Sequence, residues 1–209
     1  MDDGRTDISG MRQTLAQKRD PVIAPPSRYR MDPVIFREYD IRGVVGRDFD
    51  ADFAYALGRA YVAYIGTEAG IAEPTIALGH DPRETSPELA DALASGLRHG
   101  GAEVVRLGLV TTPMTYFATF ALPGVDGALM VTGSHNPREY NGFKICVGRS
   151  TISGADIQKL RAFLELAIRF GRTPEDCGAL ASKARQIAAM MVKTSSITSS
   201  DVSTYLRHG

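Results

Sequence analysis

Four side chains that can take part in group transfer lie close together in the middle of the chain: Ser134, His135, Asn136 and Lys144. A serine hydroxyl can carry a covalent acyl or phosphoryl group, and the other three side chains can donate hydrogen bonds to a charged intermediate. Gly133 precedes the serine and lets the backbone come close to a ligand. These residue types indicate either nucleophilic catalysis or a phosphoryl site.

Three interpretations of this loop are open from the residues alone. Acyl transfer by a serine–histidine pair is disfavoured, because Ser134 and His135 are adjacent and neighbouring side chains in an extended chain point to opposite sides. The Gly-x-Ser-x-Gly elbow is also absent. A phosphoryl site is favoured by the donors of His135, Asn136 and Lys144 together with backbone N–H groups. The third interpretation is an ordinary surface turn, since serine, asparagine and proline are common turn residues.

A second group of charges lies between residues 36 and 46, where charged and apolar residues are interleaved. Arg42 has a planar guanidinium fork that suits a phosphate group. The alternative is an edge strand with an internal ion pair, in which Arg42 pairs with Asp40 or Glu38.

A third candidate segment, Asp81 to Arg83, follows the apolar run 75–79 and precedes a helical pattern. We expect it at the carboxyl end of a strand, where open α/β sheets gather their ligands. The alternative is a structural turn in which Arg83 pairs with Asp81 or Glu84.

Alternating strands and helices must position these segments. Apolar runs predict buried strands at 75–79, 102–108, 127–131 and 143–147. Apolar residues at helical spacing predict helices over 53–65, 87–99 and 155–170, with a short helix after Thr112. The alternation predicts the α/β class, as a three-layer α/β/α domain with a mixed, mostly parallel sheet. An Asn141-Gly142 turn is expected to make one strand antiparallel.

Three local features are also predicted. The run 33–36 is expected to be extended. Thr85 or Ser86 is expected to cap the next helix, with Glu88 completing a capping box. The short helix after Thr112 is expected to have an apolar face formed by Tyr116, Phe117 and Phe120.

Composition excludes several classes of protein. Of the 209 residues 44% are hydrophobic, and 24 basic side chains balance 24 acidic ones, whereas a nucleic-acid or membrane-surface binder would carry a basic excess. No apolar run reaches the length of a membrane span and the N-terminus is not a secretory signal, so we expect a cytoplasmic location. The two cysteines form neither a disulfide framework nor a metal motif, and Cys146 is expected to be a buried thiol.

The chain is expected to have three parts. Residues 1–30 are polar and aperiodic and are predicted to be a disordered leader. Residues 31–171 form the folded domain. Residues 172–209 are richer in Ser, Thr and Ala and are predicted to be a linker with the incomplete start of a second domain.

Four motifs that occur in order resemble the N-terminal domain of the α-D-phosphohexomutase family. They are Phe36-Arg-Glu-Tyr-Asp-Ile-Arg-Gly43, Gly79-His-Asp-Pro-Arg83, Thr132-Gly-Ser-His-Asn-Pro137 and Tyr140-Asn-Gly-Phe-Lys144. The resemblance covers roughly residues 33 to 170. It is nearest to the phosphomannomutase/phosphoglucomutase branch.

The resemblance implies that Ser134 carries a phosphoryl group and exchanges it with hexose 1- and 6-phosphates through a bisphosphorylated sugar, in carbohydrate metabolism. Lys144 and Arg42 would flank the reacting oxygens, and catalysis would consist mostly of positioning and charge stabilisation. The remaining residues that the resemblance assigns to the site or its loops are His135, Asn136, Tyr39, Asp81 and Arg83.

The resemblance also implies Mg²⁺, held by phosphorylated Ser134 and an aspartate cluster of the second domain, and an activator of the glucose 1,6-bisphosphate type. No such cluster occurs in this sequence. We therefore expect weak or no activity from this chain alone, with hexose phosphate as substrate and separately encoded C-terminal domains as conceivable partners. Two alternatives stay open: a non-catalytic sugar-phosphate or anion-binding module, and a functionless partial chain with an exposed apolar inter-domain face.

Overall fold

The computed structural model describes residues 31–170. The predicted leader, the predicted linker over 172–209 and Cys177 lie outside the described residues. Within residues 31–170, no helix combines the length and apolarity that crossing a membrane requires.

A six-stranded sheet forms the middle of the domain. Its strands are β1 (Ile41–Val44), β2 (Thr75–His80), β3 (Glu103–Leu109), β4 (Gly127–Val131), β5 (Tyr140–Val147) and β6 (Ser150–Thr151). The spatial order is β1-β5-β4-β2-β3, with β6 beside β5. β2 is parallel to β3 and β4, whereas β5 is antiparallel to β1, β4 and β6. Only β5 therefore runs against the others, and the prediction of a mixed, mostly parallel sheet is confirmed.

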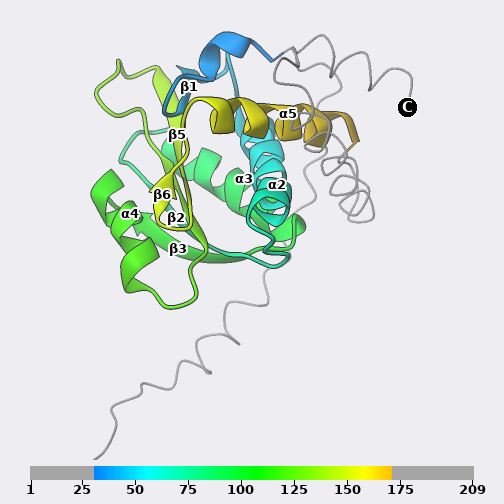
Figure 1. Ribbon diagram of the computed structural model, residues 1–209. Helices are drawn as coiled ribbons and strands as arrows, with labels where there is room; N and C mark the ends of the chain where they lie inside the picture. Colours follow the sequence, from blue (N-terminus) through cyan, green and yellow to red (C-terminus); the bar gives the residue numbers. More distant parts are fainter. Residues whose placement is uncertain (1–30, 171–209) are drawn as a thin grey trace, which may run out of the picture.

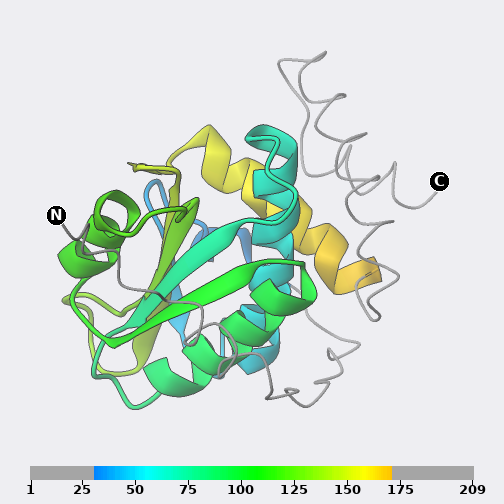
Figure 2. The same ribbon diagram turned by 90° about the horizontal axis from the view of Figure 1, so that it is seen from below.

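Helices cover the two faces of the sheet unequally, as Figures 1 and 2 show. The helices are α2 (Ala51–Glu68), α3 (Ser86–His99), α4 (Thr112–Ala121) and α5 (Ala155–Phe170). α2, α3 and α5 share one apolar core with inward residues of the sheet, whereas α4 lies alone on the other face in a small cluster with Ala77, Ala128 and Cys146. The predicted three-layer α/β/α arrangement is confirmed. Burial raises the pKa of the Cys146 thiol to about 11, as expected for a buried cysteine.

The helices on the well-covered face approach closely because α3 carries a glycine at the contact. A Cβ atom on Gly96 would collide with the carbonyl oxygen of Tyr55 in α2. Gly58 of α2 is also at the contact, since a Cβ there would lie 2.6 Å from the backbone nitrogen of Leu97. The two backbones therefore pack together, and the neighbouring apolar side chains are excluded from water.

The prediction that Tyr116, Phe117 and Phe120 form the apolar face of α4 is wrong in part. Phe117 and Phe120 are 66% and 56% exposed, and α4 instead buries Thr115, Ala118 and Thr119. The sheet surface beneath α4 presents small residues: a Cβ on Gly79 would lie 2.6 Å from the hydroxyl of Thr115. Small side chains of the helix fit against this surface, and the large aromatic ones are left outside.

Two other local predictions are wrong. The run 33–36 is not extended: Pro33–Ile35 is a 3-10 helix (η1), because Asp32 accepts a hydrogen bond from the backbone N–H of Val34 at 2.9 Å. Asn141 and Gly142 are not a turn but lie inside β5, in register with Gly43 and Arg42 of β1. The chain reverses earlier, in the loop between β4 and β5.

Candidate active site

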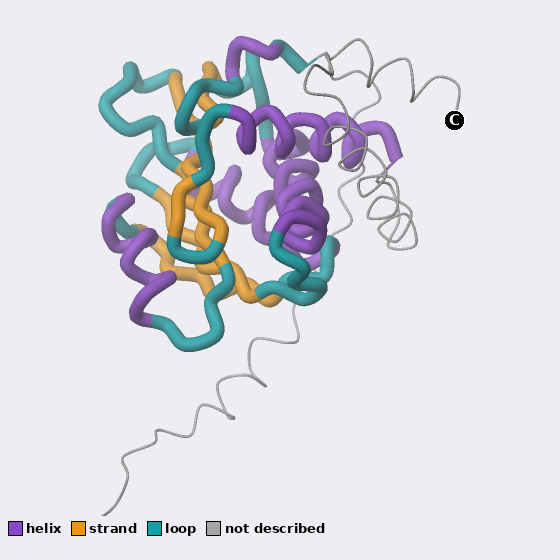
Figure 3. Tube along the Cα trace, in the orientation of Figure 1, coloured by secondary structure: helices purple, strands orange, loops and turns teal. Residues whose placement is uncertain are grey.

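The loop between β4 and β5 projects beyond the strand ends (Figure 3) and carries Ser134 with its side chain exposed. Ser134 has φ of 53°, the one positive φ at a non-glycine position among residues 31–170. This left-handed conformation is unfavourable for a serine, so the surrounding contacts must hold it. One of them is local: the Ser134 N–H donates to the hydroxyl of Thr132 at 2.8 Å.

The left-handed backbone changes the relation between Ser134 and His135. The hydroxyl oxygen of Ser134 lies 3.3 Å from Nδ1 of His135. The expectation that the two side chains point to opposite sides is wrong, because it assumed an extended chain. A ring nitrogen, which accepts a proton when the other ring nitrogen carries the hydrogen, therefore lies within reach of the serine hydroxyl. The nucleophile elbow of acyl-transfer enzymes is absent from the sequence.

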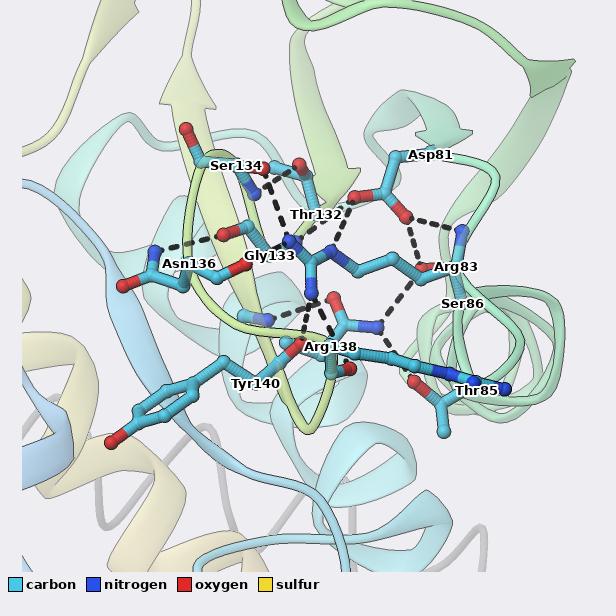
Figure 4. A network of polar contacts seen from close by, with 12 residues as sticks. Asp81, Arg83, Thr85, Ser86, Thr132, Gly133, Ser134, Asn136, Arg138 and Tyr140 are labelled. Carbon is cyan, nitrogen blue, oxygen red and sulfur yellow. Dashed lines mark hydrogen bonds and ion pairs between the residues drawn. The ribbon is translucent and has the colours of Figure 1, made fainter.

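Arg83, from the loop after β2, extends into the centre of the Ser134 loop and binds its backbone (Figure 4). Its guanidinium donates to five backbone carbonyl oxygens of the loop. They belong to Ser134 (3.1 Å), Asn136 (2.7 Å), Pro137 (2.7 Å), Arg138 (3.4 Å) and Tyr140 (3.0 Å). The predicted pairing with Asp81 is also present at 3.4 Å. With its donors directed at the loop, Arg83 holds the loop's shape, and the Ser134 side chain points away from it (Figure 4).

Asp81 binds the same loop from the other side. Its carboxylate accepts from the N–H of Gly133 at 3.0 Å, the N–H of Arg83 at 3.0 Å and the hydroxyl of Ser86 at 2.5 Å. Burial alone would raise the pKa of Asp81, but these hydrogen bonds outweigh burial and lower it. A Cβ on Gly133 would collide with the Arg83 guanidinium, so the glycine before the serine is required by close packing.

Two asparagines complete the support of the loop. The side-chain amide of Asn136 donates to the carbonyl of Gly133 at 2.8 Å, which closes the turn around Ser134. The amide of Asn141, at the start of β5, donates to the hydroxyls of Thr85 and Ser86 at 2.9 Å each. Thr85 precedes α3 as predicted, but its side chain makes no capping hydrogen bond. The predicted capping box is therefore wrong, because the Thr85 hydroxyl binds Asn141.

Arg42 and Lys144 are brought together on adjacent strands by one carboxylate. Asp40 Oδ2 accepts from an Arg42 guanidinium nitrogen at 2.6 Å and from Lys144 Nζ at 2.9 Å. The predicted Arg42–Asp40 ion pair is confirmed. The sequence did not reveal that Lys144 joins it, since the two residues are 104 positions apart. Tyr39, next to Asp40, has its side chain 70% exposed.

The register of the sheet relates the pair Arg42 and Lys144 to the loop that carries Ser134. Lys144 of β5 lies opposite Met130 of β4, four residues before Ser134. Met130 and Ser134 line one open cavity of about 490 Å³, together with Thr111 and Thr112 at the start of α4. This volume lies within the range of small-ligand sites, and the exposed serine is one of the residues that line the cavity.

The described residues do not provide a fitting site for magnesium. Mg²⁺ prefers a nearly octahedral set of oxygen ligands that includes carboxylates. Residues 31–170 contain no group of three or more carboxylate, histidine or cysteine side chains that would hold a metal. The Asp81 carboxylate, which binds the serine loop, has both oxygens bound to donors of the protein. A metal at Ser134 would therefore need ligands from beyond the described residues.

A family model and two curated relatives point to the same family. Residues 33–166 match the family model described as phosphoglucomutase/phosphomannomutase, alpha/beta/alpha domain I. A phosphoglucomutase of Neisseria gonorrhoeae is 49% identical over 131 residues, which cover 63% of this chain and 28% of that protein. A phosphomannomutase/phosphoglucomutase of Pseudomonas aeruginosa is 48% identical over 132 residues, which cover 63% of this chain and 27% of that protein.

Two solved structures resemble the fold. A phosphoglucomutase/phosphomannomutase family protein of Burkholderia thailandensis superposes with a TM-score of 0.61 and 42% identity, covering 68% of this chain and 32% of that one. A structure titled as a putative phosphomannomutase of Thermus thermophilus gives a TM-score of 0.54 and 28% identity, covering 67% and 30%. The chain thus spans about 30% of the length of the relatives that it matches.

Proposed function

Since the chain belongs to the phosphoglucomutase/phosphomannomutase family through its alpha/beta/alpha domain I, we propose that Ser134 carries the phosphoryl group of a phosphohexomutase. The substrates are hexose 1- and 6-phosphates, of mannose or glucose, and the reaction is an intramolecular phosphotransfer. The observation that carries the proposal is an exposed serine in a left-handed conformation, held by Arg83 at the edge of a cavity.

The proposed step is a phosphoryl transfer between two oxygens. When the serine is loaded, its Oγ forms a bond to phosphorus while the bond from phosphorus to a sugar oxygen of a bisphosphorylated hexose breaks. The serine proton goes to an acceptor, for which Nδ1 of His135 lies at 3.3 Å, and the sugar oxygen gains a proton. In the reverse direction phosphoserine gives its phosphoryl group to the free hydroxyl of a hexose 1- or 6-phosphate, and the serine is then loaded again from the other phosphate of the bisphosphorylated sugar, which leaves the isomeric monophosphate.

The positive charge that such a transition state needs would come from Lys144 and Arg42. The phosphoryl oxygens carry the developing charge, and positioned cations stabilise it. Asp81, Arg83 and Asn136 keep the loop in shape and have no direct part in the chemistry. Tyr39 is assigned to the rim of the site on the strength of its position in the motif and its exposure.

Turnover is proposed for the whole protein and not for this domain alone, because the matched relatives are more than three times as long as the matched region. Magnesium ligands and contacts to the distal phosphate of the substrate would come from further domains. The proposal includes a cytoplasmic setting, consistent with phosphorylated sugars as substrates.

The proposal is tested by intact-mass measurement of the whole protein, with its further domains and Mg²⁺ present, after incubation with glucose 1,6-bisphosphate. We expect the protein to gain the mass of one phosphoryl group and to lose it again on addition of mannose 1-phosphate or glucose 1-phosphate. Ser134→Ala should abolish the gain, whereas Ser150→Ala, at an exposed serine of β6, should keep it.

A gain that persists in Ser134→Ala would contradict the assignment of the serine. No gain in the wild-type protein, combined with calorimetric binding of a hexose phosphate, would instead support a non-catalytic sugar-phosphate-binding module.

A further inference from the structure

We propose that Asp40 is a positioning residue that holds Lys144 and Arg42 in one fixed arrangement for the phosphoryl transfer at Ser134. The inference rests on the proposed function, since it concerns the two cations assigned to that reaction. It adds a residue whose side chain touches neither the serine loop nor, in this account, the substrate.

The geometry makes Asp40 a shared anchor. A single oxygen, Oδ2, receives Arg42 at 2.6 Å and Lys144 at 2.9 Å. Arg42 lies on β1 and Lys144 on the neighbouring antiparallel strand β5, where Arg42 is paired with Gly142. Residues 142 and 144 share one face of the strand, so the two cationic side chains emerge on the same side of the sheet.

Burial makes the anchor rigid. The Asp40 side chain is 7% exposed, whereas Arg42 and Lys144 are 23% and 21% exposed. Each cation therefore has its Asp40 contact inside the protein and part of its surface open to solvent. A lysine ammonium has three donors and a guanidinium five, so donors remain that Asp40 does not use.

Electrostatics explains why a carboxylate is needed at this position. Two cations that share one acceptor oxygen repel each other, and at partial burial that repulsion is weakly screened. Burial would raise the pKa of Asp40, but the hydrogen bonds from Lys144 and Arg42 lower it overall, so Asp40 stays ionised between them. The group as a whole retains net positive charge for an incoming phosphate.

The position of the group relative to α4 supports a role at the open face of the sheet. Lys144 is paired across the sheet with Met130 of β4, whose sulfur lies 3.2 Å from the hydroxyl of Thr115 in α4. Paired residues of neighbouring strands share a face of the sheet, so Lys144 and its Asp40 contact lie on the α4 face, and Met130 lines the same cavity as Ser134.

Two readouts test the proposal. The first is the rate at which glucose 1,6-bisphosphate loads the protein with a phosphoryl group, followed by intact mass. The second is independent of activity: trace acetylation of Lys144 relative to Lys159, quantified on peptides.

The variants are Asp40→Asn, which keeps the shape and removes the charge, and Asp40→Glu, which keeps the charge. Asp91→Asn is the control, because that carboxylate also pairs with an arginine but is 67% exposed on α3.

We expect Asp40→Asn to slow loading by about tenfold or more, because a transition state loses correctly placed charge. Acetylation of Lys144 should rise, since its amine is no longer held, and Asp40→Glu should restore part of both properties. Circular dichroism should show Asp40→Asn to be folded. Asp91→Asn should match the wild type in both readouts.

If the wild type loads but Asp40→Asn leaves either loading or Lys144 acetylation unchanged, the proposal is overturned while the proposed function stands. If the wild type takes up no phosphoryl group, the proposed function has failed. The acetylation readout then decides alone: a rise in Asp40→Asn supports the anchoring of Lys144 by Asp40, and no rise overturns it.

Discussion

The two faces of the sheet differ in what their residues do. On the face covered by α2, α3 and α5, large apolar side chains form one continuous core. On the other face α4 packs through small residues, and the neighbouring strands β1 and β5 carry Arg42 and Lys144. Apolar burial is therefore concentrated on one face, and the two cations that we propose to act in phosphoryl transfer lie on the other.

The Ser134 loop follows the end of β4, and the interactions that stabilise it differ from those on either face of the sheet. Its contacts are hydrogen bonds from Arg83 and to Asp81, with little apolar burial. Substitutions can therefore separate three properties: packing of the helices, shape of the loop and charge of the open face.

The largest expected effect is on the covered face, at Gly96. Gly96→Ala places a Cβ atom against the backbone of Tyr55, which cannot move without separating α2 from α3. We expect a loss of about 3 kcal/mol in the free energy of unfolding, measured by urea denaturation. Gly66→Ala is the matched control in α2, because a Cβ there meets its nearest neighbour at an ordinary 3.5 Å. It should be neutral or stabilising, and equal losses in both variants would contradict the close-contact explanation.

The next effect concerns the loop. Arg83→Lys keeps the charge but cannot reach the five carbonyl oxygens that the guanidinium binds. We expect a loss of about 2 kcal/mol in the free energy of unfolding and faster hydrogen exchange in the loop between β4 and β5. Phosphoryl loading of Ser134 should fall in parallel. Arg106→Lys, a surface arginine of β3 paired with Asp91, should leave all three measurements unchanged. Unchanged hydrogen exchange in Arg83→Lys would refute the account of how the loop is held.

An effect of similar size near neutral pH, which becomes smaller in acid, is expected at Asp81. The pKa of Asp81 is lowered from 3.8 in the folded protein, so its ionised form stabilises the fold above the unfolded pKa. That contribution is lost as the pH falls through the folded pKa. Asp81→Asn should therefore cost about 2 kcal/mol of unfolding free energy near neutral pH. The difference from wild type should shrink below about pH 4. If the difference in unfolding free energy between wild type and Asp81→Asn grows on acidification, the ionised form of Asp81 does not stabilise the fold.

The smallest effect is expected on α4. Phe117 is 66% exposed, so Phe117→Ser should change the free energy of unfolding by less than about 0.5 kcal/mol. Leu93 in α3 is completely buried, and Leu93→Ala should cost about 3 kcal/mol. Chemical denaturation of the two variants compares the faces directly. Similar losses would mean that α4 carries as much of the core as α3.

Features that depend on local pattern could be predicted from the sequence. Apolar runs and helical spacing predicted β2, β3, β4, β5 and the four α-helices, because burial repeats with the period of the element. One antiparallel strand was also predicted, but from an Asn141-Gly142 turn that does not form. The pairing of Arg42 with Asp40 and of Arg83 with Asp81 was accessible too, since each pair is two residues apart.

Features that depend on contacts between distant segments could not be predicted. The bonds from Arg83 to the serine loop span 51 to 57 positions, and nothing near Arg83 in the sequence indicates them. The same holds for Lys144 and Asp40. Asn141-Gly142 has the composition of a turn, but pairing with β1 keeps it in a strand. The inward face of α4 depends on small residues of the sheet beneath it.

We propose that the Ser134 loop directs phosphoryl transfer to one hydroxyl among several in the same cavity. Fragmentation mass spectrometry of protein loaded with glucose 1,6-bisphosphate locates the added group. We expect all of the added phosphoryl group on Ser134 and none on Thr111, Thr112 or Thr132, which line the same cavity. A phosphoryl group on one of those threonines, or none on Ser134, would contradict it.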